Sequence, residues 1–220
     1  MERYLRKLIL EGESQKLDFK YCISDSRKIA RTLSAFANTD GGKLLIGVRD
    51  NGSIAGVRSD EEYYMIETAA SLFCRPEIPV TIKQHNSDGK TILEVEVIKG
   101  ENRPYEAKGE DGRWKAYFRK GDQNLAANGV LLHLWRKQVR KTGVLIRFGK
   151  PENMLMEYLK VNGSVTISAF RKMARIPAFR AEKIIVNLML CDVIVMEASE
   201  KGFHYILNQQ INTEDLPAGK

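Results

Sequence analysis

The architecture of the first half of the chain follows from one short segment, AFANTDGGKLLIGV at residues 35–48. It opens on the end of an apolar helical face that runs from Ile29 through Leu33 to Phe36. Two glycines then permit left-handed backbone and predict the end of the helix. The run Leu44–Val48 is continuously apolar, which predicts a central strand buried on both faces.

On both sides of this segment, the spacing of apolar residues predicts the remaining elements of the same domain. Helices are expected over residues 1–12, from a cap at Asp25 or Ser26 to residue 37, over 60–73, and after a cap at Asn128 over 130–139. Strands are expected over residues 16–20, 80–82, 91–97, 105–107 and 114–119, and the turn at 50–52 is expected to return as a hairpin through 54–57. We therefore predict a mixed α/β domain over residues 1–142.

The composition changes after this domain. Between Asn128 and Pro151 the chain has no acidic residue and the basic residues Arg136, Lys137, Arg140, Lys141, Arg147 and Lys150, which indicates a connection to a second unit. Residues 143–220 are predicted to form three helices, the second capped by Ser168, and then a hairpin of 193–196 with 203–207. This order is that of a winged helix-turn-helix, so the expected fold class is an α/β domain followed by a winged helix.

The whole composition is that of an ordinary water-soluble chain with a basic surplus. No apolar run approaches the roughly 18 residues of a membrane helix, and the first residues lack a signal peptide's apolar core. The cysteines Cys22, Cys74 and Cys191 are odd in number and far apart, which predicts a reducing, cytoplasmic location without disulfide or zinc. The formal net charge of +7 favours a polyanionic partner.

The second unit carries most residues expected to contact nucleic acid. The third helix of a winged helix lies in the major groove, and here Arg180, Lys183 and Asn187 fall opposite the apolar stripe, where they are predicted to reach base edges. Other cations are predicted to bind phosphates, namely Arg136, Lys137, Arg140, Lys141, Arg171, Lys172 and Arg175. DNA is the favoured partner and RNA stays open; such binding requires no cofactor. The other interpretations are a solvated face or a docking surface.

Separated motifs in the first domain resemble those of a known family. They are ESQKLDFK at residues 13–20, AFANTDGGKLLIGV at 35–48, RPY at 103–105 and AYFRKG at 116–121. In this order they resemble the Schlafen-type AlbA domain over about residues 10–135. The resemblance implies a DNA-binding domain of bacterial type, commonly followed by a winged helix, in a regulator of transcription.

The same resemblance implies an alternative activity. Nuclease members of the Schlafen family use three carboxylates in metal-dependent RNA cleavage, and the matching positions here are Glu13, Asp18 and Asp50, with Lys20 assisting. Such a cluster would hold Mg²⁺ or Mn²⁺. The chain departs from the family pattern because Asp18 stands in place of a glutamate and Arg49 in place of an acid, and we expect Arg49 to compete for the carboxylates. The alternative interpretation is that Asp18 and Lys20 form a surface ion pair on an edge strand and that Asp50 only forms a turn.

Cationic and aromatic residues also alternate over 113–119. A strand there predicts that Trp114 and Phe118 face the core and that Tyr117 and Arg119 face solvent with Lys115, although interleaved cations and rings are also typical of a nucleic-acid surface.

Together these patterns predict a nucleic-acid-binding regulator of transcription that has no membrane contact. The alternatives are a metal-dependent RNA endonuclease and a protein–protein adaptor that dimerises through the winged helix. A homodimer would also match a palindromic DNA site.

Overall fold

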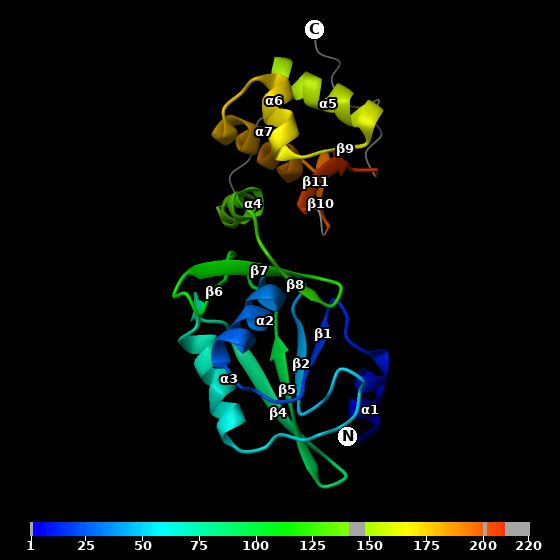
Figure 1. Ribbon diagram of the computed structural model, residues 1–220, viewed down its shortest axis with the longest axis vertical. Coiled ribbons are helices and arrows are strands. Elements are labelled where there is room, and N and C mark those ends of the chain that lie inside the picture. Colours follow the sequence, from blue (N-terminus) through cyan, green and yellow to red (C-terminus); the bar gives the residue numbers. More distant parts are fainter. Residues whose placement is uncertain (1, 141–147, 200–201, 210–220) are drawn as a thin grey trace. The chain divides into compact units, whose positions relative to one another are not determined.

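The computed structural model describes residues 2–140, 148–199 and 202–209 (Figure 1). The contacts within the chain divide it into two compact units, Met1–Ala127 and Asn128–Lys220. This division falls before helix α4 (Gly129–Val139), which packs on helix α7 (Ala178–Leu190), whereas the sequence placed the boundary after residue 142. In the described ranges, no helix is both long and apolar enough to cross a membrane.

A mixed four-stranded sheet forms the centre of the first unit. Its strands, in spatial order, are β1 (Leu17–Lys20), β2 (Gly42–Ile46), β5 (Lys90–Val97) and β4 (Val80–Ser87). β1 and β2 are parallel, with Phe19 opposite Leu45, and β5 runs antiparallel to both of its neighbours. The apolar run at 44–48 therefore supplies an inner strand, as predicted, and the parallel pair is joined through helix α2 (Ser26–Asn38).

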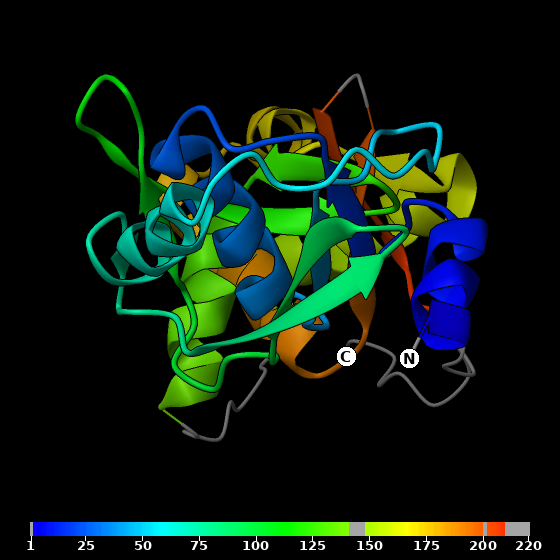
Figure 2. The same ribbon diagram turned by 90° about the horizontal axis from the view of Figure 1, so that it is seen from below.

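Helices cover both faces of this sheet. On one face, α1 (Glu2–Glu11) packs its Leu5 among Phe19, Leu45 and Ile92. On the other face, α2 packs over a larger apolar cluster that includes Leu44. Figure 2 shows α1 and α2 on opposite sides of β1 and β2. Side chains on both faces of β2 are therefore buried, which explains why apolar and polar residues do not alternate along it.

A second sheet packs on the far side of α2, so that this helix lies between two sheets. Its strands are β3 (Cys74–Arg75), β6 (Glu106–Lys108), β7 (Trp114–Lys120) and β8 (Gln123–Ala126), and helix α3 (Glu61–Ser71) lies beside α2. The amide of Asn38 donates to the carbonyls of Tyr105 and Tyr117, at 2.7 and 2.8 Å, and its Oδ1 accepts from the Tyr105 N–H. Polar side chains of α2 thus satisfy backbone groups of the second sheet.

The turn after α2 depends on both of its glycines. Gly41 has φ +70°, the left-handed region that favours glycine, while a Cβ on Gly42 would lie 2.5 Å from the Phe36 ring. The predicted hairpin after residue 50 is not formed as a strand pair; within residues 47–57, all described, only an isolated bridge joins Val48 to Ile54. The Lys20 carbonyl accepts from the N–H groups that follow Ile46, which ends the strand ladder there.

The second unit contains the three helices and the hairpin that the sequence predicts for residues 143–220, together with α4 and the short strand β9 (Ser164–Val165). Its elements are α4, α5 (Lys150–Asn162), β9, α6 (Ile167–Ala174), α7, β10 (Ile194–Ser199) and β11 (Gly202–Leu207). The three strands form a sheet in the order β10-β11-β9. Phe170, Ile185 and Tyr205 are fully buried. The hydroxyl of Thr166, rather than Ser168, accepts from the Ala169 N–H and caps α6, because the helix begins two residues earlier than expected.

Candidate nucleic-acid interface

Asp18, the central carboxylate of the predicted catalytic set, is buried on β1 beneath α2 and already has cationic partners. Its side chain lies 3.2 Å from Nη2 of Arg119 and 3.0 Å from Nζ of Lys20. The hydroxyl of Thr32 on α2 donates to it at 3.5 Å. Only 2% of Asp18 is exposed, so these partners replace water around a buried charge. Asp18 and Lys20 do form an ion pair, but its acidic partner is not on the surface.

Arg119 makes most of the contacts in this cluster, although the sequence pattern predicted that its side chain faces solvent. It lies on β7 with its side chain fully buried and its guanidinium over the Phe36 ring. Besides Asp18, the guanidinium donates to the carbonyls of Ser14 and Leu17 at 3.0–3.1 Å and to Oδ1 of Asn124 at 3.0 Å. A planar group with five donors suits several oxygen acceptors at once. β7 thus buries both Tyr117 and Arg119, so the prediction is wrong for these two residues, whereas Phe118 is buried and Lys115 is exposed as predicted.

Glu13 is brought next to Asp18 by the turn that precedes β1. Its Oε1 accepts from the Phe19 N–H at 2.9 Å. Burial raises the pKa of the Glu13 carboxyl, and a hydrogen bond with Asp18 raises it further. Two of the three predicted carboxylates are therefore neighbours.

Asp50 does not join them. It lies exposed in the turn after β2, and no group of three potential Asp, Glu, His or Cys ligands occurs in the described part of the chain. Since Asp18 is bound by Arg119 and Lys20, its oxygens do not present the anionic cage that Mg²⁺ or Mn²⁺ needs. The residues do not fit the predicted metal. Arg49 does not compete for the carboxylates either, because its guanidinium lies over the ring of Tyr21.

A second buried carboxylate, Glu94, occupies the α1 face of the sheet. Lys43 donates to it, Tyr4 donates at 2.9 Å and Nε2 of His85 lies at 2.7 Å. Burial raises the pKa of Glu94, but the hydrogen bonds from Lys43 first, then Tyr4 and His85, outweigh burial and leave the pKa below its ordinary value. The same contacts outweigh burial at Lys43 and raise its pKa. This cluster stabilises the fold from beneath α1.

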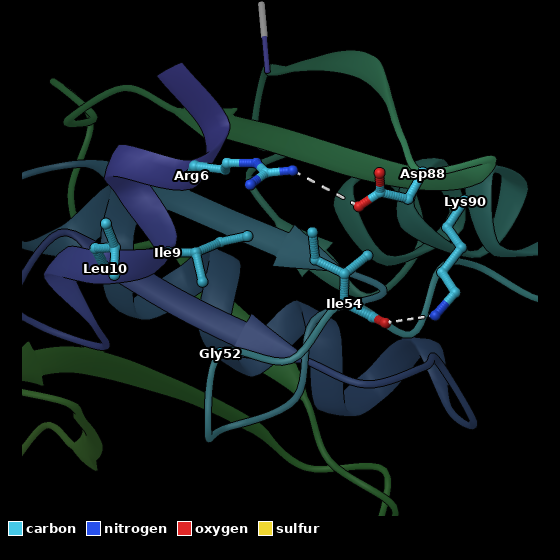
Figure 3. A pocket seen from close by; sticks show the side chains of 7 residues that line it. All are labelled: Arg6, Ile9, Leu10, Gly52, Ile54, Asp88 and Lys90. Atoms are coloured by element: carbon cyan, nitrogen blue, oxygen red, sulfur yellow. Dashed lines mark hydrogen bonds and ion pairs between the residues drawn. The ribbon is translucent and has the colours of Figure 1, made fainter. Parts of the chain in front are cut away.

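A cavity of about 510 Å³ lies beside this cluster's helix, between α1, the 49–54 turn and the β4–β5 hairpin (Figure 3). Its lining residues are Arg6, Ile9, Leu10, Gly52, Ile54, Asp88 and Lys90. Arg6 faces Asp88 at 3.7 Å, and Lys90 donates to the Ile54 carbonyl at 2.9 Å. The floor is apolar and the charged groups on the rim already have partners, so the cavity supplies no catalytic arrangement.

In the second unit, five of the cations predicted to contact nucleic acid lie on or directly after α6 and on the first half of α7. Arg171 and Lys172 are exposed on α6, and Arg175 follows it with φ 52°, in the left-handed region. Arg180 and Lys183 are exposed on α7. Among the described residues, none of these five cations has an acidic side chain within 4 Å.

Two other residues of α7, Glu182 and Asn187, are instead engaged by α4. Lys137 donates to Oδ1 of Asn187 at 2.8 Å, and Nδ1 of His133 lies 3.3 Å from Glu182. Two residues that the sequence assigned to nucleic acid thus bind each other. Arg136 and Arg140 are exposed at the end of α4; Lys141 lies outside the described residues.

Comparison with known proteins matches the first unit to one family. The family model described as Schlafen, AlbA_2 matches residues 13–128, more than half of the chain. A crystal structure of the DIP2311 protein from Corynebacterium diphtheriae is 18% identical with a TM-score of 0.44, over 64% of this chain and 34% of that chain. The N-terminal domain of a RecG-related protein from Nitrosomonas europaea is 24% identical with a TM-score of 0.39, over 53% of this chain and 87% of that domain. No curated protein matches significantly.

Proposed function

Because this chain belongs to the Schlafen, AlbA_2 family, we propose that it binds nucleic acid, with duplex DNA as the favoured ligand, and that it regulates transcription. The observation that carries the proposal is the cationic surface of α6 and the first half of α7. It is formed by Arg171, Lys172, Arg175, Arg180 and Lys183, which are exposed and lack acidic partners within the described ranges. Cations without protein partners are available to phosphates, and they release counterions when they bind.

The element order of the second unit supports a winged helix as the carrier of this surface. The short strand β9 lies between α5 and α6 in the sequence, and the hairpin of β10 and β11 follows α7. Strand β11 of this hairpin pairs with β9. In that assignment α7 is the helix for the major groove. Its base-reading residues are then Arg180 and Lys183 near its N-terminus, while Asn187 supports the helix through Lys137.

The test is a titration of labelled duplex DNA with the wild-type chain and with Arg180→Ala/Lys183→Ala, at salt concentrations between about 50 and 200 mM. The wild-type affinity should fall steeply with salt. Arg180 and Lys183 also neutralise phosphate charge as they enter the groove, so the loss of both cations should lower the slope of log affinity against log salt by up to about 1.8. At low salt the double variant should bind on the order of tenfold or more weakly.

A matched control is Lys150→Ala/Lys160→Ala, which removes two exposed cations from α5 and leaves α6 and α7 intact. It should keep the wild-type slope. If both double variants lost the same DNA affinity, the change in net charge alone would explain the effect. An unchanged affinity in the α7 variant would overturn the recognition-helix assignment and favour the adaptor role, for which light scattering would report a dimer.

The metal-dependent nuclease has no comparable support. Its three carboxylates do not assemble, and Asp18 is held by Arg119 and Lys20. We also propose a homodimer. A palindromic duplex tests it, because two half-sites one helical turn apart would be bound by the α7 helices of two copies of the chain.

A further inference from the structure

A tyrosine and two arginines meet at the carboxyl ends of the parallel strands in the first unit. Tyr21 directly follows β1, Arg49 lies in the turn after β2, and Arg58 precedes α3. The Cζ atoms of Arg49 and Arg58 lie 4.8 and 5.1 Å from the centroid of the Tyr21 ring. Nη2 of Arg58 also donates to the Tyr21 hydroxyl at 3.0 Å. Ligands of sheets with parallel strands commonly bind at this end of the strands.

The two guanidinium groups form no ion pair within the described part of the chain. No acidic side chain lies within 4 Å of either one among the described residues, although Asp50 is adjacent in sequence to Arg49. The nearby carboxylate of Glu62 is buried and accepts instead from the backbone N–H groups of Ile23 and Arg58. Because both Cζ atoms lie about 5 Å from one ring centre, they are less than about 10 Å apart, a distance at which salt screens their repulsion only in part.

The surroundings hold these side chains in place and leave them open to solvent. Arg49 and Arg58 are exposed, and Tyr21 is 39% exposed. Nη1 of Arg49 reaches the Ser53 hydroxyl at 3.4 Å, and backbone hydrogen bonds between Arg49, Gly52 and Ser53 close the turn. The hydrogen bond and charge of Arg58, and then the charge of Arg49, lower the pKa of the Tyr21 hydroxyl, as expected where the local potential is positive.

We propose that Tyr21, Arg49 and Arg58 form a phosphate-binding site at the carboxyl ends of β1 and β2. The planar forks of two arginines match the oxygens of a phosphate, and a phosphate placed between them removes their mutual repulsion. The ligand is a phosphodiester of nucleic acid or a free phosphate, which share this chemistry. Binding of a phosphodiester rests on the proposed function. It would give the first unit its own contact with the nucleic acid, separate from that of α7.

The test follows the guanidinium N–H signals of the full-length chain by NMR during titration with inorganic phosphate and, separately, with a single-stranded oligonucleotide. Both ligands should shift the signals of Arg49 and Arg58. The Arg49→Ala/Arg58→Ala variant should bind at least about tenfold more weakly, and Arg49→Lys/Arg58→Lys should recover only part of the affinity because the fork is lost.

Arg75→Ala is the matched control. Arg75 also lies over an aromatic ring, that of Trp114 at 4.5 Å, but it has Glu106 as a partner at 2.7 Å, so its loss should leave phosphate binding unchanged. Thermal unfolding of each variant confirms that the fold is retained.

The outcomes separate the two sources and the two proposals. Shifts with phosphate alone support the site with a free anion as ligand, and shifts with both support the nucleic-acid strand. Wild-type signals that move with neither ligand, or equal affinities in wild type and Arg49→Ala/Arg58→Ala, overturn the site. The Arg180→Ala/Lys183→Ala variant should keep the phosphate shifts, so a failure of duplex binding alone removes the α7 proposal and leaves this one standing.

Discussion

Arg119 and Arg49 lie in the same unit of the molecule and show two opposite uses of one side chain. Arg119 is fully buried and donates to four different oxygen acceptors, one of which is the Asp18 carboxylate. Arg49 is exposed, and within the described ranges its guanidinium contacts the Tyr21 side chain and the Ser53 hydroxyl but no carboxylate. The first arginine is a structural component and the second is available to a ligand. The supply of acceptors from the fold, rather than residue type, decides between these uses.

The largest expected effect tests the buried side of this comparison. Arg119→Met leaves the Asp18 carboxylate buried and unpaired on its Arg119 side, so the free energy of unfolding should fall by about 3–5 kcal/mol. Urea denaturation measures the change. Adding Asp18→Asn should return part of the loss, since the uncompensated charge is then removed. If the free energy of unfolding of Arg119→Met fell by less than about 1 kcal/mol, Arg119 would not be the structural component that its contacts indicate.

Glu94 extends the comparison to a buried anion. Glu94→Gln removes the charge that Lys43, Tyr4 and His85 satisfy, and should cost about 1–3 kcal/mol at neutral pH. Because the pKa of Glu94 is lower in the folded state, its stabilisation is present above the unfolded pKa of about 4.3 and is lost as the pH falls through the lower, folded pKa. Unfolding followed from pH 7 to pH 2 should therefore show a smaller acid-limb loss in Glu94→Gln than in wild type.

Asn187 sharpens the comparison within the second unit, because it is a polar side chain with a protein partner. Asn187→Ala removes the hydrogen bond from Lys137 and should lower the free energy of unfolding by about 1 kcal/mol. Its affinity for duplex DNA should stay within about twofold of wild type, in contrast to Arg180→Ala/Lys183→Ala. A tenfold loss of DNA affinity without a change in stability would restore Asn187 as a base-reading residue.

The smallest expected effect is at the exposed Arg49. Arg49→Met should change the free energy of unfolding by no more than about 0.5 kcal/mol, since an exposed cation over a ring contributes little to folding. Its phosphate response should nevertheless weaken. The same urea experiment that is applied to Arg119→Met provides the measurement, and similar losses for the two arginines would abolish the distinction between them.

Local patterns were sufficient for the elements but not for the environment of each side chain. Residues 35–48 predicted the end of α2 and the inner strand β2 correctly, because helix termination and two-sided burial leave signals in adjacent residues. The burial of Arg119 leaves no such signal. Its acceptors at Ser14, Leu17 and Asp18 are about a hundred positions away, and only the packing of β7 on α2 brings them together.

The two proposed binding surfaces differ in the same respect. The cations of α6 and α7 were named from helical spacing within one short stretch. Tyr21, Arg49 and Arg58 were not grouped in advance, although the parallel pairing of β1 with β2 places the residues that follow the two strands at one edge of the sheet. Prediction of the parallel pair was therefore the missing step. The packing of α4 on α7 was also missed, since α4 had been assigned to the other domain.

The position of α2 between two sheets has a consequence for how the first unit unfolds. Most residues of α2 are buried, among them the small residues Ala30, Ala35 and Ala37 on the sides that an apolar stripe does not mark. Neither sheet can separate from this helix without exposing its buried residues, and separation of the second sheet also breaks the hydrogen bonds of Asn38. The amide protons of α2 should then exchange with solvent only through global opening, which makes both sheets and the helix a single cooperative unit.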